Sequence, residues 1–171
     1  MNYKEKLNNV KAFIFDVDGV FTDGKVYLFE NDVVRAFYSK DGYAVQYASK
    51  LGYLVIIVTG GDSKEVKKRL ENLGVQKVYL KASNKSNILK EILNDFNLEK
   101  SEILYMGDDI PDIPVLKTVG VSTCPKDACI DVKDIVDYHS PYPGGKGCVR
   151  DVIEQTLRVQ GKWLKDLAFE W

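Results

Sequence analysis

The sequence contains few cysteines and a single histidine, which excludes several kinds of site. Cys124, Cys129 and Cys148 are an odd number without a C-x-x-C spacing, so neither a disulfide framework nor a zinc ribbon is expected. No base–nucleophile pair can be named for His139. We therefore interpret the cysteines as reduced, partly buried thiols.

Long apolar runs and an excess of one charge are also missing. No run approaches the roughly 20 residues of a membrane span, and the N-terminal stretch lacks the apolar segment of a signal peptide. The 24 basic and 25 acidic residues are interleaved and leave a net charge of −1, which provides no basic surface for nucleic acid. We therefore expect a cytoplasmic protein with neither a nucleic-acid nor a membrane partner.

The chain does contain a regular alternation of apolar strands and amphipathic helices. The runs 10–15, broken only by Lys11, and 53–58 are typical of buried parallel strands. Helical spacing follows over 64–73 and 84–96. This alternation predicts an α/β fold, a doubly wound three-layer α/β/α sandwich with a central parallel sheet, built as one domain over residues 1–171.

The sequence also predicts the remaining elements. Asp41 is expected to be the N-cap of a helix over 41–51. Further strands are expected over 75–80, 102–106, 120–123 and 135–138, and further helices over 111–119, 125–132 and 148–160.

One segment after the first strand departs from this alternation. Residues 25–29 and 33–38 are β-rich runs separated by a short polar turn, which predicts a hairpin insertion at about 24–39. Its apolar side chains favour association, because an exposed apolar hairpin is prone to associate unless a partner covers it. The C-terminal tail, about 161–171, also ends in apolar residues without an evident covering element.

Polar residues follow the apolar strands at four places. They are Asp16 with Asp18, Thr59 with Gly60, Lys85, and Asp108 with Asp109 and Asp112. The carboxyl ends of parallel strands meet at one edge of a sheet, so we expect these groups to converge. Each group alone has an ordinary interpretation as a turn, a solvated lysine or a helix cap. Together they favour a Mg²⁺ site, because converging carboxylates repel one another and this ion prefers carboxylate oxygens.

The two acids of the first strand suit complementary steps of phosphoryl transfer. Asp16 can attack phosphorus as a covalent nucleophile. Asp18 lies on the same side of the strand, where it can protonate the leaving oxygen and then activate water. Lys85 and a metal ion would neutralise phosphoryl oxygens, which Thr59 and backbone N–H groups near Gly60 would also bind.

These motifs, in this order, resemble the four motifs of the haloacid dehalogenase superfamily of phosphatases. They are D-x-D-G-V-x-T at 16–22, T-G at 59–60, Lys85, and G-D-D-x-x-D at 107–112. The resemblance covers about residues 10–160.

The resemblance implies a role for each acid. Asp16 would form an aspartyl-phosphate, and Asp18 would be the general acid and base. Mg²⁺ would be held by Asp16, the backbone carbonyl of Asp18 and Asp108, with Asp109 and Asp112 as supporting carboxylates.

The spacing of the motifs leaves no room for a cap domain. The chain is similar to the capless 3-deoxy-D-manno-octulosonate 8-phosphate (KDO 8-phosphate) phosphatases, through the hairpin that follows D-V-D-G-V-F-T-D-G, K-D-G-Y at 40–43, G-G-K-G-C-V-R at 144–150 and Q-G-K-W at 160–163. This similarity implies that substrate, a role in lipopolysaccharide biosynthesis, and a homotetramer. In such a tetramer the hairpins pack into a central barrel and a neighbouring subunit helps to close each active site.

The same resemblance implies a set of substrate contacts. They are Tyr38, Ser39, Lys40, Asp41, Gly42 and Arg69, together with Asp18, Gly60 and Lys85. Gly61 and Gln46 stand where the family commonly has arginine, which weakens the expected recognition of an anionic sugar acid. Lys40, Lys146 or Arg150 are candidates to compensate.

Several alternatives stay open at this point. A nine-carbon ulosonate 9-phosphate (KDN 9-phosphate) or another small sugar phosphate is an alternative substrate. A binding module without turnover is the alternative from another functional class, although all four motif positions are filled. The glycine-rich loop at 144–147 lacks the Walker spacing, so a structural turn is its simpler interpretation.

Overall fold

The computed structural model describes residues 2–30 and 32–171. Its centre is a six-stranded sheet in the order β5-β4-β1-β6-β7-β8, in which all neighbours are parallel. The strands are β1 (Ala12–Phe15), β4 (Leu54–Val58), β5 (Lys77–Tyr79), β6 (Ile103–Met106), β7 (Val121–Cys124) and β8 (Tyr138–His139). The predicted α/β class and parallel sheet are confirmed.

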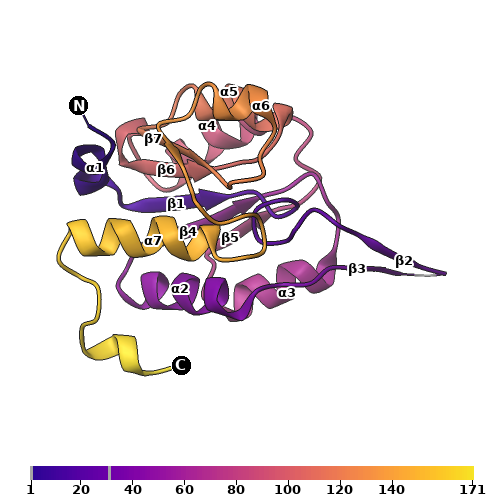
Figure 1. The fold of residues 1–171 in the computed structure, drawn as a ribbon, viewed down its shortest axis with the longest axis horizontal. Coiled ribbons are helices and arrows are strands. Elements are labelled where there is room, and N and C mark those ends of the chain that lie inside the picture. Colours follow the sequence, from indigo (N-terminus) through magenta and orange to yellow (C-terminus); the bar gives the residue numbers. More distant parts are fainter. Residues whose placement is uncertain (1, 31) are drawn as a thin grey trace.

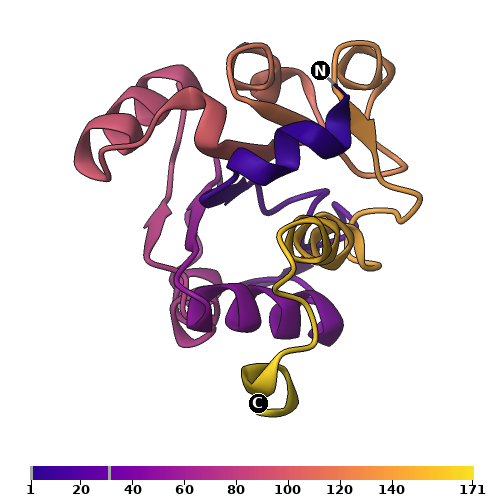
Figure 2. The same ribbon diagram turned by 90° about the vertical axis from the view of Figure 1, so that its left-hand side faces the viewer.

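Helices cover both faces of the sheet (Figures 1 and 2). One face carries α2 (Ser39–Lys50), α3 (Lys64–Asn72) and α7 (Cys148–Val159), and the other carries α4 (Lys85–Asp95), α5 (Ile113–Leu116) and α6 (Ile130–Lys133). A short N-terminal helix, α1 (Tyr3–Lys6), was not expected from the sequence. Single 3₁₀ turns lie at Leu7–Asn9, Lys100–Glu102, Ile110–Asp112 and Asp166–Phe169.

Strand β1 joins the two layers because its side chains alternate between them. Phe13 and Phe15 pack in the core under α2, α3 and α7, whereas Ala12 and Ile14 pack in the core under α4 and α5. All four side chains are fully buried. The strand is therefore held on both sides, and the residues that follow Phe15 start from a fixed point at the sheet edge.

The hairpin predicted after β1 is present. Strands β2 (Tyr27–Phe29) and β3 (Asp32–Val34) pair antiparallel and form a sheet of their own. The hairpin extends away from the body of the molecule (Figure 1). Its apolar side chains are exposed, with 78% of Leu28 and 64% of Phe29 accessible to solvent. No cap domain is present in the described part of the chain.

The structure corrects three expectations about elements. Asp41 is not the N-cap of α2, because the helix starts two residues earlier with Tyr38 at that position. The helix expected over 111–119 is a 3₁₀ turn followed by the single turn of α5, and the helix expected over 125–132 begins only at Ile130. The last two of these segments contain proline, which restricts the preceding residue and removes a backbone donor.

The C-terminal tail is partly covered, contrary to expectation. Trp163 and Ala168 are buried, and the hydroxyl of Tyr47 on α2 donates a hydrogen bond to the Lys162 carbonyl at 2.7 Å. The Tyr47 ring also packs edge-on against Trp163. Phe169 and Trp171 are still largely exposed. Helix α2 is therefore the covering element that the sequence pattern did not reveal.

No helix among the described residues is both long enough and apolar enough to cross a lipid bilayer.

Candidate active site

A cavity of about 510 Å³ opens at the carboxyl edge of the sheet, beside the ends of β1, β4 and β6. All four predicted motifs contribute to its lining. The lining residues that the motif analysis singled out are Asp16, Asp18, Thr59, Gly60, Gly61, Lys85, Asp108, Asp109 and Asp112. The expected convergence therefore occurs, because β4, β1 and β6 are neighbours in the sheet.

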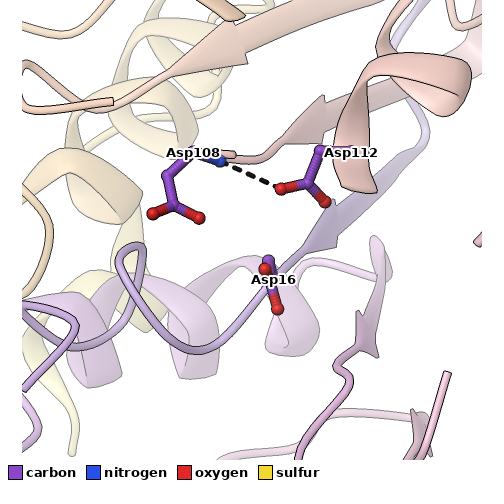
Figure 3. Close-up of side chains that lie close together, drawn as sticks. All are labelled: Asp16, Asp108 and Asp112. Carbon is purple, nitrogen blue, oxygen red and sulfur yellow. Dashed lines mark hydrogen bonds between the residues drawn. The ribbon is translucent and has the colours of Figure 1, made fainter. Parts of the chain in front are cut away.

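Three carboxylates gather in this cavity from two strand ends (Figure 3). Asp16 follows β1 directly, and its N–H extends the ladder by donating to the Met106 carbonyl at 3.1 Å. Asp108 and Asp112 lie in the loop and turn after β6. One oxygen from each of the three carboxylates lies within 4.8 Å of the others. Oxygen ligands at this separation suit a divalent cation.

Asp112 is already engaged in hydrogen bonds. Its Oδ1 accepts from the Lys85 Nζ at 2.7 Å and from the Tyr105 hydroxyl at 2.6 Å. Its Oδ2 accepts from the backbone N–H groups of Asp108 at 3.1 Å and of Asp109 at 3.3 Å. The Asp108 carboxylate accepts no hydrogen bond from the described residues. Asp108 is therefore the better placed of the two for a metal ion, and Asp112 holds the loop and the lysine.

Lys85 is the first residue of α4 and lies buried between two acids. Its Nζ is 2.9 Å from Asp16 Oδ2 as well as 2.7 Å from Asp112 Oδ1. Burial alone would lower the pKa of Lys85, but the Asp16 and Asp112 carboxylates outweigh it and raise the pKa. The lysine is therefore a fixed positive charge beside Asp16.

Burial dominates the electrostatics of the two acids in this cavity. It raises the pKa of Asp16 to about 6, although Lys85 opposes the shift. Burial and the neighbouring Asp16 and Asp112 carboxylates raise the pKa of Asp108 to about 7. Excess negative charge at a partly desolvated site is the condition that a bound divalent cation relieves.

Asp18 has a partner that the sequence analysis did not identify. Arg35, which follows β3 of the hairpin, binds it in a bidentate manner, with Nε 2.6 Å from Oδ1 and Nη2 3.2 Å from Oδ2. The only signal in the sequence is a lone arginine inside a β-rich apolar stretch. Tyr105 was missed for a similar reason, because its hydroxyl lies within a strand that otherwise reads as apolar.

The glycine of the first motif, Gly19, has a steric reason. A Cβ atom at this position would lie only 1.9 Å from Asp108 Oδ2, and its φ of +82° is rarely adopted by other residues. The loop after β1 is thus able to pass directly under the Asp108 carboxylate.

The comparisons with known proteins agree with this geometry. Residues 36–120 match the model of the haloacid dehalogenase-like hydrolase family. The KDO 8-phosphate phosphatase KdsC of Escherichia coli K12 is 35% identical over 158 residues, covering 92% of this chain and 84% of that protein. The KdsC of Haemophilus influenzae is 31% identical, covering 93% and 89%.

Solved structures show the same similarity. The KDO 8-phosphate phosphatase of Yersinia pestis superposes with a TM-score of 0.92 at 31% identity, covering 94% of this chain and 87% of the other. That of Moraxella catarrhalis, in complex with magnesium, phosphate and KDO, gives 0.91 at 29% identity, covering 94% and 93%.

The chain belongs to the haloacid dehalogenase-like hydrolases. The family predicted from the four motifs and the missing cap domain is therefore confirmed. The prediction that the chain is a phosphatase is confirmed as well.

Several expected substrate contacts of this hydrolase lie outside the cavity that contains Asp16. Tyr38 and Lys40 line a separate cavity of about 380 Å³, and Arg69 is exposed on α3. Ser39 is exposed in the first turn of α2, whereas Asp41 and Gly42 are buried there. Within one chain, this stretch does not touch the carboxylate cluster.

Of the proposed compensating cations, Lys146 and Arg150 line the same separate cavity as Lys40. The Arg150 guanidinium lies over the rings of Tyr43 and Trp163, 5.5 Å from each centroid, and its Nε is 3.3 Å from Glu154 Oε2. Arg150 is therefore held in an aromatic and acidic setting of its own.

His139 and the glycine-rich loop at 144–147 both make structural contacts. His139 lies on the edge strand β8, where its Nε2 is 2.7 Å from the Lys133 carbonyl oxygen. The glycine-rich loop packs on the loop after β1, and the Gly145 N–H donates to the Val20 carbonyl at 2.9 Å. These contacts support a structural turn at 144–147.

Proposed function

We propose that this chain is a Mg²⁺-dependent phosphomonoesterase that hydrolyses KDO 8-phosphate to KDO and phosphate. The observation that carries the proposal is the buried Asp16 carboxylate, which has an oxygen within 4.8 Å of an Asp108 oxygen and lies 2.9 Å from the Lys85 Nζ. This arrangement offers a nucleophile, metal ligands and a fixed cation within one cavity. The similarity to KdsC phosphatases of several bacteria supports the substrate class.

The donor set fits the expected metal. The carboxylates of Asp16 and Asp108 and the backbone carbonyl of Asp18 would hold Mg²⁺, a cation that prefers oxygen ligands. When bound, Mg²⁺ withdraws charge from the phosphoryl oxygens and relieves the repulsion between the acids.

The chain's own residues account for both steps of the hydrolysis. In the first, an Asp16 oxygen forms a bond to phosphorus while the bond from phosphorus to the sugar oxygen breaks, and Asp18 donates a proton to that oxygen. In the second, Asp18 takes a proton from water as the water oxygen bonds to phosphorus, and the bond to Asp16 breaks. Lys85 stays protonated and stabilises the charge that develops on the phosphoryl oxygens.

The replacement of two family arginines by Gly61 and Gln46 favours a second candidate substrate class. A site with fewer cations should bind the carboxylate of a sugar acid less tightly. A small sugar phosphate without a carboxylate is therefore the alternative that this observation favours, and a nine-carbon ulosonate 9-phosphate stays open as a further substrate.

A phosphate-release screen with Mg²⁺ tests both candidates. KDO 8-phosphate, KDN 9-phosphate, hexose phosphates and an aryl phosphate are compared, with Asp16→Asn as the inactive control. We expect the highest kcat/KM on an ulosonate phosphate, and at least about a 1,000-fold loss in Asp16→Asn because the nucleophile is removed. Turnover of none of these substrates would favour a binding module, and an active Asp16→Asn would contradict the nucleophile.

We also infer a cytoplasmic homotetramer in which the hairpins associate. The exposed apolar hairpin supports the association. Tyr38 and Lys40 line a cavity separate from that of the carboxylates, which leaves a place for a neighbouring subunit to complete the site.

A further inference from the structure

Arg35 and Asp18 form a bidentate ion pair between the hairpin and the first catalytic motif. Among the described residues, no other ion pair joins the hairpin to the four motifs. The guanidinium fork matches the carboxylate, with 2.6 Å and 3.2 Å between the paired atoms. The Arg35 side chain is only 12% exposed although it lies on a projecting hairpin. A partly buried, bidentate pair fixes the direction of a carboxylate better than a fully solvated one does.

Gly61 borders the guanidinium directly. A Cβ atom at this position would lie 3.5 Å from Thr59 Oγ1, 3.6 Å from Arg35 Nη2 and 3.8 Å from Asp18 Oδ2. These are ordinary contact distances, so alanine fits there. A longer side chain would have to enter the space that the guanidinium occupies.

We propose that Arg35 is the positioning residue for the Asp18 carboxyl group, and that Gly61 provides the space that its guanidinium needs. The Asp18 side chain is 37% exposed, so without Arg35 it would sample several rotamers at the mouth of the cavity. Proton transfer requires a donor within hydrogen-bond reach of the leaving oxygen. This inference rests on the proposed function, because it assigns Arg35 a role only through the task of Asp18.

The leaving group separates this role from a merely structural one. A sugar alkoxide is a poor leaving group that needs a proton, whereas a nitrophenolate leaves without one. Arg35→Gln should therefore lower kcat/KM for the best sugar phosphate of the screen at least about 10-fold more than kcat/KM for 4-nitrophenyl phosphate. A general loss of fold would lower both alike. Lys64→Gln removes an exposed cation from a surface cavity that Arg35 also lines, and is the matched control.

Three further variants change the pair at Arg35 or at the neighbouring Gly61. Arg35→Lys keeps the charge but not the fork, and should recover only part of the selective loss. Gly61→Leu should reproduce the selective loss of Arg35→Gln while leaving Arg35 in the sequence, and Gly61→Ala should lose much less. Gly61→Leu with the same preference between substrates as the wild type would overturn the role of Gly61.

A double-mutant cycle with Asp18→Asn decides the outcome. If Arg35 acts through Asp18, Arg35→Gln should change kcat/KM for the sugar phosphate less than about 2-fold in the Asp18→Asn background. Additive losses, or a selective loss in Asp18→Asn without one in Arg35→Gln, would overturn the role of Arg35 while the proposed function stands. A wild type that hydrolyses none of the phosphates would overturn both.

Discussion

Lys85 is the residue that makes a cluster of buried acids compatible with a folded chain. Its ammonium group bridges Asp16 and Asp112, and all three side chains are almost inaccessible to solvent. Removing one partner of a buried ion pair leaves an uncompensated charge, which costs much more than the intact pair contributes. The lysine thus holds the acids of the site together, in addition to the phosphate binding proposed for it.

We therefore expect Lys85→Met to lower the free energy of unfolding by about 3–5 kcal/mol in the absence of metal, because Asp16 and Asp112 lose their common cation. Urea unfolding followed by circular dichroism measures the change. Lys90→Met, at an exposed position on the same helix, is the matched control and should stay within about 0.5 kcal/mol of the wild type. Equal stability of the two variants would contradict the bridging role.

Single residues of the site could be predicted where the chain order alone places them. Asp16 and Thr59 follow apolar strands directly and Asp108 follows one after a single glycine, and the parallel sheet then brings them together. Arg35 and Tyr105 could not be found in this way. Each side chain points at a partner elsewhere in the chain, Arg35 at Asp18 17 residues away and Tyr105 at Asp112 7 residues away. No periodicity in the sequence encodes these directions.

Asp41 links two helices that lie far apart in the sequence. It lies in the first turn of α2, yet its Oδ1 accepts the backbone N–H of Arg150 in the first turn of α7 at 2.8 Å. Helix α7 begins after Gly147, which has no side chain to cap it. Asp41 therefore caps a helix that begins more than a hundred residues later, and it joins the two helices that pack side by side on one face of the sheet.

The pKa of Asp41 makes this contact sensitive to pH. Burial raises its pKa from 3.8 to about 6, and its Oδ2 has no hydrogen-bond partner among the described residues. The folded state therefore retains the proton more tightly than the unfolded state does. Its contribution to stability is complete below about pH 4 and is lost as the pH rises through about 6.

Asp41→Asn should consequently gain stability relative to the wild type as the pH rises from 4.5 to 7.5, by about 2 kcal/mol, since asparagine keeps a neutral acceptor for the Arg150 N–H. Urea unfolding of both proteins at the two pH values gives this difference and cancels the titration of other groups. Asp131→Asn, at an exposed position in the first turn of α6, is the control. The same difference at both pH values would show that Asp41 is ionised in the folded protein throughout.

Elements were predictable from the sequence in proportion to their length and periodicity. The apolar strands β1 and β4 and the periodic helix α4 lie within the predicted ranges. The helix ranges predicted around Pro111, Pro114 and Pro125 were wrong. A single helical turn has too few residues to show a helical period, and its prolines restrict where the turn can begin. The cover that α2 gives to the tail was missed because it depends on tertiary packing alone.

At the scale of the whole molecule, the hairpin is the feature that a single chain does not explain. Its sheet has two strands and no covering layer in the described part of the chain, and an isolated hairpin is marginally stable in water. Six of its large apolar side chains are more than 40% exposed. They are Val26, Tyr27, Leu28, Phe29, Val33 and Val34. Burial of this surface between subunits would stabilise both the hairpin and the position of Arg35 at its base.

The double variant Leu28→Asp, Phe29→Asp should therefore dissociate the proposed tetramer, because four chains would each bring two new carboxylates into one apolar seam. Size-exclusion chromatography with light scattering should give four times the chain mass for the wild type and the chain mass for the variant. Ile130→Asp, at a side chain that is 72% exposed on α6, should keep the wild-type mass. A monomeric wild type, or a variant that stays assembled, would contradict association through the hairpin. If the variant is monomeric, its kcat/KM for the sugar phosphate should also fall, since Arg35 would then be held by an unsupported hairpin.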